Sequence, residues 1–256
     1  MKNGFTYREV CPGVLDIKDP LGVHMTLLVG REQALLFDTG YGVENLSTFV
    51  GSLTKLPLTT LLSHGHHDHA MGAMHFPSVR MLSEDLPVFH AYTGRGQRER
   101  ILKQAGLNAE AREQFLSAAI RAPDALEEDC FDLGGFSARV LRVPGHTPGS
   151  IALLVPQREL LLLGDSWNRE TWLFFPESLP VRTYAASFRF LMSHPFKVAL
   201  APHVEETVDR EYLIAFERGL NEAGFANAKP AIIPGYEHMD TRAYEPCPGA
   251  RLVFSA

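Results

Sequence analysis

The chain reads His64-Gly65-His66-His67-Asp68-His69 shortly after its first quarter. Imidazoles and a carboxylate at the offsets H-x-H-x-D-H can hold two metal ions side by side. A polar, solvated, histidine-rich loop is the alternative interpretation. It is disfavoured because the stretch follows an apolar run and does not lie at a chain terminus. The stretch therefore predicts metal chemistry.

The run before it, Leu58-Thr59-Thr60-Leu61-Leu62-Ser63, is short, rich in branched side chains and preceded by Pro57. Such a run is typical of a buried strand. In α/β folds, functional groups gather just beyond the C-terminal ends of strands. The position of the histidines therefore agrees with the chemistry that their spacing predicts.

Three more candidate ligands follow strand-like runs further along the chain. His146 lies in the turn Pro144-Gly145-His146-Thr147-Pro148-Gly149, where prolines and glycines fix the backbone. Asp165 directly follows Leu161-Leu162-Leu163-Gly164, where an unpaired charge is costly, and His203 follows a run that begins at Val198. Each alone could be an ordinary core or turn residue. Together with the first cluster they predict a metal site.

These motifs, preceded by Asp38 in Phe37-Asp38-Thr39-Gly40, resemble the pattern of the metallo-β-lactamase superfamily over positions 38 to 203. The resemblance implies an α/β fold, specifically a four-layer αββα sandwich. Asp38 is expected to orient the ligands without binding metal, although a strand-end turn residue is an equal alternative. Pro202 precedes His203 where the family more often has glycine, which makes His203 the least secure ligand.

The resemblance also implies the role of each ligand. His64, His66 and His146 would bind the first metal, Asp68, His69 and His203 the second, and Asp165 would bridge both.

Histidine and carboxylate ligands suit two divalent ions, with Zn²⁺ as the default and Mn²⁺ or iron as alternatives. Two such ions can bridge a water and present it as hydroxide to a substrate. Asp68 is the candidate catalytic residue, because it lies close enough in sequence to position the water or to pass a proton to the leaving group.

Composition narrows the possible partners. The 256 residues are 45% hydrophobic and carry a formal net charge of −6, which gives no basic surface for a nucleic acid. The three widely spaced cysteines, Cys11, Cys130 and Cys247, indicate reduced thiols of an intracellular protein. No apolar leader or membrane-spanning stretch is visible, so we expect a cytoplasmic location and no membrane partner.

The alternation of strand-like and helix-like runs predicts a single domain over 1–256, with a helical cap inserted at about 84–127. The expected strands and helices are 24–29, 34–38, 43–53, 58–63, 98–104, 109–120, 137–143, 151–155, 159–163, 184–193 and 208–223. The tail from 229 to 256 is expected to form edge strands or a homodimer contact.

The fold does not choose a substrate by itself, but the acidic composition disfavours a nucleic acid. A small-molecule ester, thioester or lactone is therefore the favoured substrate, as in glyoxalase II-like or lactonase-like enzymes. The alternatives are an iron-dependent redox or oxygen-using member, a phosphodiesterase and a non-catalytic binding module. The cap and the loop 166–176, which holds Trp167 and Trp172, are expected to shape the pocket. A buried edge is the alternative for that loop. Arg95, Arg98 and Arg100 in the cap could contact an anionic substrate, but such a charge run is more often a solvated helix face, so none of them is a predicted site residue.

Overall fold

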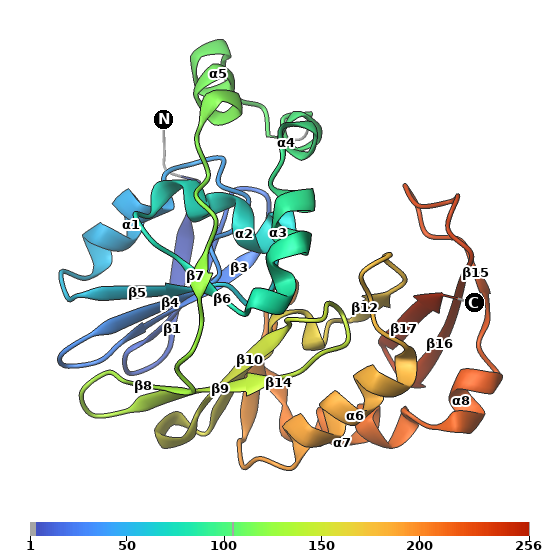
Figure 1. Ribbon diagram of the computed structural model, residues 1–256. Coiled ribbons are helices and arrows are strands. Elements are labelled where there is room, and N and C mark those ends of the chain that lie inside the picture. Colours follow the sequence, from blue (N-terminus) through green and yellow to red (C-terminus); the bar gives the residue numbers. More distant parts are fainter. Residues whose placement is uncertain (1–3, 104, 256) are drawn as a thin grey trace. The chain divides into compact units, whose positions relative to one another are not determined.

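The computed structural model describes residues 4–103 and 105–255 (Figure 1). The chain divides into two compact units, Met1–Ala138 and Arg139–Ala256. The expectation of a single domain over 1–256 stays a prediction. The end of the predicted helix 98–104 lies outside the described residues.

The first unit is built on a seven-stranded sheet with the order β1-β2-β3-β4-β5-β6-β7. Its first four strands are antiparallel, and β5, β6 and β7 then add parallel to β4. The strands are β1 Thr6–Cys11, β2 Val14–Lys18, β3 His24–Val29, β4 Ala34–Phe37, β5 Leu58–Leu61, β6 Arg80–Met81 and β7 Asp124–Ala125; β8 Cys130–Asp132 lies outside this sheet.

The described part of the first unit also contains helices. They are α1 Leu46–Leu53, α2 His67–Ala70, α3 Leu86–Tyr92, α4 Arg95–Ile101 and α5 Ala109–Ser117, with the 3₁₀ helices η1 Met71–His75 and η2 Ser83–Asp85. The core beneath α1 is apolar, with Leu27, Leu36 and Val50 at most 1% exposed. Burial of each such side chain contributes about 1.5–3 kcal/mol to folding.

Three features of the first unit differ from the sequence prediction. The strand at 34–38 stops at Phe37, because Asp38 takes a left-handed conformation with φ +70°. The helix expected from 43 begins at Leu46, because the Asn45 side chain caps it by accepting a hydrogen bond from the Thr48 N–H. The prediction that the cap is helical throughout is wrong at its end, where Asp124–Ala125 forms β7 beside β6.

The second unit contains two sheets. One has the order β14-β13-β11-β10-β9 within this unit, and the other is four-stranded with the order β12-β17-β16-β15. The strands are β9 Ser137–Arg142, β10 Ile151–Val155, β11 Leu160–Leu162, β12 Glu170–Leu173, β13 Val198–Leu200, β14 Val208–Asp209, β15 Lys229–Ala231, β16 Thr241–Cys247 and β17 Ala250–Ser255. The helices are α6 Val181–Met192, α7 Arg210–Gly219 and α8 Glu222–Ala226, with η3 Pro156–Arg158 and η4 Gly164–Ser166.

The core of the second unit lies between α6, α7 and the strands. Trp167, Phe188 and Phe216 are at most 1% exposed there. The C-terminal tail does form strands, but β16 and β17 lie inside their sheet and only β15 lies at its edge. Among the described residues, the helices are all too short or too polar to span a bilayer.

The mixed sheets with their helices confirm the α/β fold class. Strands expected at 24–29 and 151–155 are present with the same bounds. The sequence pattern identified these elements because each is a short apolar run between turn residues.

Candidate metal centre

The histidine-rich stretch forms a tight loop after β5 and a single turn of helix, α2. The backbone carbonyl of His66 accepts hydrogen bonds from the amides of His69 and Ala70, at 3.1 and 2.9 Å. This turn brings the imidazoles together. The ring centroid of His64 lies 4.7 Å from that of His66 and 4.2 Å from that of His69. His64, His66 and His69 are all buried.

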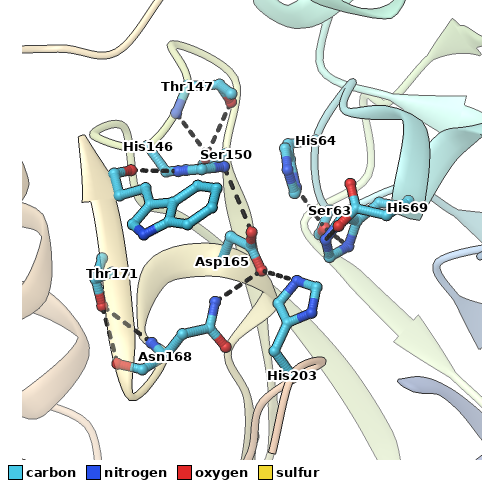
Figure 2. A network of polar contacts seen from close by, with 12 residues as sticks. Ser63, His64, His69, His146, Thr147, Ser150, Asp165, Asn168, Thr171 and His203 are labelled. Atoms are coloured by element: carbon cyan, nitrogen blue, oxygen red, sulfur yellow. Dashed lines mark hydrogen bonds and ion pairs between the residues drawn. The ribbon is translucent and has the colours of Figure 1, made fainter. Parts of the chain in front are cut away.

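Asp38 and Ser63 hold two of these rings. Oδ1 of Asp38 accepts a hydrogen bond from the Ser63 amide at 2.6 Å, and Oδ2 accepts from the Ser63 hydroxyl and from Nδ1 of His69, both at 2.8 Å. Ser63 Oγ lies 2.9 Å from Nδ1 of His64 (Figure 2). Because Nδ1 of each ring is engaged, Nε2 is the nitrogen that can bind a metal.

Gly65 lies between the first two histidines. It is fixed by helix α3 and by Asp85, the residue directly before that helix. Its amide donates a hydrogen bond of 2.7 Å to Oδ2 of Asp85, a carboxylate that is 0% exposed. A Cβ at Gly65 would lie 2.4 Å from the backbone nitrogen of Phe89. Only glycine lets the loop approach α3 this closely. No local sequence signal indicated Asp85 or Ser63.

Asp68 and His69 lie side by side at the end of this loop. Nε2 of His69 is 3.6 Å from Oδ2 of Asp68, whose side chain is 15% exposed. His67 belongs to none of the groups of described residues that could hold a metal ion, and its ring lies 5.5 Å from that of Tyr41 and 6.1 Å from that of Tyr92. Its omission from the predicted ligands agrees with this environment.

In the second unit, the turn at 144–149 presents His146. Its Nδ1 donates a hydrogen bond of 2.7 Å to the backbone carbonyl of Trp172, and its own carbonyl accepts from the Ser178 hydroxyl at 2.9 Å. A Cβ on Gly145 would lie 2.9 Å from the ring of Tyr184, so the turn packs tightly on α6. Thr147 and Ser150 close the turn, with their hydroxyls 2.8 Å apart (Figure 2).

Asp165 joins the two histidines of this unit (Figure 2). Its Oδ2 lies 3.5 Å from Nε2 of His146, and its Oδ1 lies 3.4 Å from Nε2 of His203. The side-chain amide of Asn168 donates a hydrogen bond of 3.0 Å from Nδ2 to Oδ1, which fixes the carboxylate. Sequence reasoning missed Asn168, which follows Asp165 by three residues in a segment without a distinctive motif.

The spacing of these atoms fits a metal. Two ligand atoms on one tetrahedral cation, each about 2.1 Å from it, lie about 3.4 Å apart. The three imidazole–carboxylate separations, in the pairs His69–Asp68, His146–Asp165 and His203–Asp165, are 3.6, 3.5 and 3.4 Å. They are longer than a charge-assisted hydrogen bond and close to the ligand spacing around a shared cation.

The predicted ligands are thus gathered within each unit. Each of the seven is among the histidines and aspartates that could hold a metal ion. The first unit supplies His64, His66, Asp68 and His69, and the second supplies His146, Asp165 and His203.

The structure corrects one expectation about the pocket and assigns a role to one arginine of the cap. Trp167 is 0% exposed and packs in the core of the second unit, with its ring 5.8 Å from that of Tyr212, so it does not line a pocket. Arg98 in the cap uses its guanidinium to bond backbone carbonyls at 115, 116 and 118, which is a structural task. Trp172, in β12, is half-buried in an aromatic cluster.

A sequence model of the metallo-β-lactamase superfamily matches residues 19–203. This match covers more than half of the chain and includes Asp38 and all seven predicted ligands. The chain belongs to the metallo-β-lactamase superfamily. The family expected from the motifs is therefore confirmed.

Several curated proteins are similar to this member of the superfamily. The probable metallo-hydrolase YqgX of Bacillus subtilis is 29% identical over 57% of this chain and 66% of its own length. The acyl-coenzyme A thioesterase MBLAC2 of Gallus gallus is 28% identical over 54% and 55%, and the hydroxyacylglutathione hydrolase GloC of Haemophilus influenzae is 26% identical over 53% and 61%. The matches thus span only about half to two thirds of these relatives.

Solved structures share the fold. A metallo-β-lactamase from Pontibacter korlensis has a TM-score of 0.62 at 17% identity and covers 87% of this chain and 99% of its own. TTHA1623, solved in a di-iron-bound form, has a TM-score of 0.51 at 25% identity over 75% of this chain and 92% of its own.

Proposed function

We propose that this superfamily member is a metal-dependent hydrolase of small-molecule esters, with thioesters as the preferred class. In this proposal two divalent ions are held by His64, His66, Asp68, His69, His146, Asp165 and His203.

One observation supports the proposal above all others: the histidines are oriented in the same way in both units. Nδ1 of His69 is fixed by Asp38 and Nδ1 of His146 by the Trp172 carbonyl. Nε2 of each ring then lies 3.5–3.6 Å from a carboxylate oxygen. Oxygen acceptors on the far nitrogen are the usual support for a metal-bound imidazole, because they fix its tautomer and orientation.

The bound cations and the side chains around them have different roles in the proposed hydrolysis. When bound, the two cations lower the pKa of a water and polarise the carbonyl that it attacks. Asp165 presents one oxygen toward His146 and the other toward His203, which suits a carboxylate shared between two sites. Asp68, with its side chain 15% exposed beside His69, is positioned to accept the proton of the attacking water and to deliver it to the leaving group.

The substrate class rests on the relatives. One is named an acyl-coenzyme A thioesterase and another a hydroxyacylglutathione hydrolase, and both of these names describe S-acyl compounds. The net charge of −6 gives no electrostatic attraction for a nucleic acid. A small thioester is therefore the first substrate to test, with lactones and phosphodiesters as the alternatives.

Metal analysis is the first experiment. Protein purified without added metal or chelator is expected to carry close to two divalent ions per chain by mass spectrometry. Zinc is the proposed metal, and TTHA1623 makes iron the named alternative outcome. A chain that binds no metal, even after reconstitution, would rule out the proposal.

Activity is then measured on acyl-CoA and acylglutathione thioesters, a lactone and a phosphodiester. The variant Asp68→Asn is expected to lose at least about 100-fold in kcat while its metal content stays near that of the unchanged protein. His90→Gln, at an exposed histidine of α3, is the matched control and should retain activity. Full activity of Asp68→Asn would remove the proton-transfer role, and hydrolysis of the phosphodiester alone would replace the substrate class.

A further inference from the structure

An aromatic cluster lies in the second unit beside the predicted metal ligand His146. It consists of Trp172, Phe174, Phe175 and Tyr236, whose ring centroids lie 4.8–5.9 Å apart in every pairing. Phe174 is 1% exposed and forms the buried base. The other three rings are only partly buried. We call Trp172, Phe175 and Tyr236 the aromatic platform.

The platform is attached directly to the candidate metal centre. The carbonyl of Trp172 is the acceptor for Nδ1 of His146, at 2.7 Å. The ring of Phe175 lies 6.0 Å from the imidazole of His146 in an edge-on arrangement. A group that packs on these rings therefore lies next to the atoms where a substrate carbonyl would react.

Strand pairing fixes Trp172, and a turn fixes the backbone of Tyr236. Trp172 pairs with Val253 of β17, and its indole N–H donates a hydrogen bond of 2.7 Å to Glu170. Glu170 is in turn paired with Arg251 at 2.8 Å, so the charges beside the indole compensate each other. Tyr236 is fixed by its amide, which donates to the Ile233 carbonyl at 2.9 Å. A preorganised apolar surface binds an apolar group with little loss of conformational entropy.

We propose that the aromatic platform binds the apolar acyl group of the substrate and so sets a preference for longer acyl chains. This inference rests on the thioester hydrolase activity proposed above. The acyl side is favoured because the leaving groups of such thioesters, coenzyme A and glutathione, are polar and charged. Phe175 and Tyr236 offer an apolar surface. The Glu170–Arg251 pair leaves no net charge there that would attract a charged leaving group.

A binding experiment tests the platform without requiring catalysis. Metal-free protein is titrated with the carboxylates butyrate, hexanoate, octanoate and decanoate, followed by tryptophan fluorescence. Affinity is expected to rise about twofold to fourfold per added methylene. Trp172→Phe should remove the fluorescence change, because the other tryptophan, Trp167, is fully buried in the core.

Variants then locate the binding surface. Tyr236→Ala is expected to flatten the dependence of affinity on chain length, whereas Tyr236→Phe should preserve it. Phe190→Ala is the matched control, because Phe190 is a 45% exposed aromatic residue on α6 with a ring contact only to His194 among the described aromatic pairs. Equal behaviour of Tyr236→Ala and Phe190→Ala, or binding that ignores chain length, would overturn the proposal.

Kinetics on acyl-CoA thioesters separates this inference from the proposed function. The unchanged protein should show a kcat/KM that rises from acetyl to octanoyl, and Tyr236→Ala should lose about 10-fold on octanoyl but little on acetyl. If no thioester is hydrolysed, the proposed function fails while the carboxylate titration still decides on the platform. If thioesters are hydrolysed without regard to acyl length, the platform proposal fails and the hydrolase proposal stands.

Discussion

Oδ2 of Asp38 lies 2.8 Å from Nδ1 of His69, although 31 residues separate the two in sequence. Both side chains are at most 2% exposed. Asp38 reaches this position because its backbone turns sharply out of β4 at φ +70°. A buried carboxylate that fixes the tautomer of an imidazole prepares the opposite nitrogen for a metal.

Asp38→Asn is therefore expected to weaken metal binding by about 10- to 100-fold. Asparagine tolerates the left-handed backbone, so the fold should remain, but its amide cannot replace both accepting oxygens. Affinity is measured by competition with a chromophoric chelator. Asp16→Asn is the control, because Asp16 is a buried carboxylate of the same unit that bonds His24 at 2.9 Å. Equal affinities of the two variants would contradict an orienting role for Asp38.

Asp85 is expected to support the metal-binding loop through its bond to the Gly65 amide. Asp85→Ala leaves that buried N–H without this acceptor, at a cost of about 1–3 kcal/mol in the free energy of unfolding. Asp85→Asn keeps an accepting oxygen and should cost less. Urea unfolding of metal-free protein measures both variants. A smaller loss for alanine than for asparagine would show that the bond does not stabilise the loop.

Gly65 itself should not accept a side chain. Gly65→Ala places a methyl group 2.4 Å from the Phe89 backbone nitrogen, so we expect a loss of about 1–3 kcal/mol of stability. Gly51, within α1, has open space around the position of a Cβ. Gly51→Ala should therefore raise stability by about 0.5–1 kcal/mol, because alanine favours a helix. Thermal unfolding of the pair distinguishes steric conflict from a general effect of glycine replacement.

Much of this architecture could be predicted because its signals are local. The apolar run Ala34–Phe37 is a strand by composition alone, and the turn around His146 is marked by its own prolines and glycines. The order of the ligand motifs then identified the superfamily. These features depend on neighbours in sequence, which a single chain displays directly.

The remaining features depend on distant partners. The two-residue strand Asp124–Ala125 exists only because Arg80–Met81 is available to pair with it. Tyr236 joins Trp172 across 64 positions, and no spacing rule relates them. The burial of Trp167 likewise follows from packing against α7 and not from its place in a loop. Tertiary contacts determine these three features, so the sequence pattern alone could not predict them.

The last prediction concerns pH. Burial lowers the pKa of His75, at the end of η1, to about 4, and its Nδ1 is buried with no hydrogen-bond partner among the described residues. In the unfolded chain this imidazole titrates near its ordinary pKa of 6.5. The unfolded state therefore takes up a proton first as the pH falls. The free energy of unfolding is therefore not reduced by His75 above about pH 6.5. Below that pH it falls progressively toward pH 4, by at most about 3 kcal/mol.

His75→Leu should remove this part of the pH dependence, because leucine cannot be protonated. Unfolding free energies are measured with the metal chelated, so that protonation of the predicted ligands does not release metal during the experiment. We expect the free energy of unfolding of His75→Leu, relative to that of the unchanged protein, to increase as the pH falls from 7.5 to 5. His194→Leu serves as the control, since His194 is a partly exposed histidine of the second unit. A gain of the same size in that control would indicate a general effect of removing a histidine and would contradict the assignment to His75.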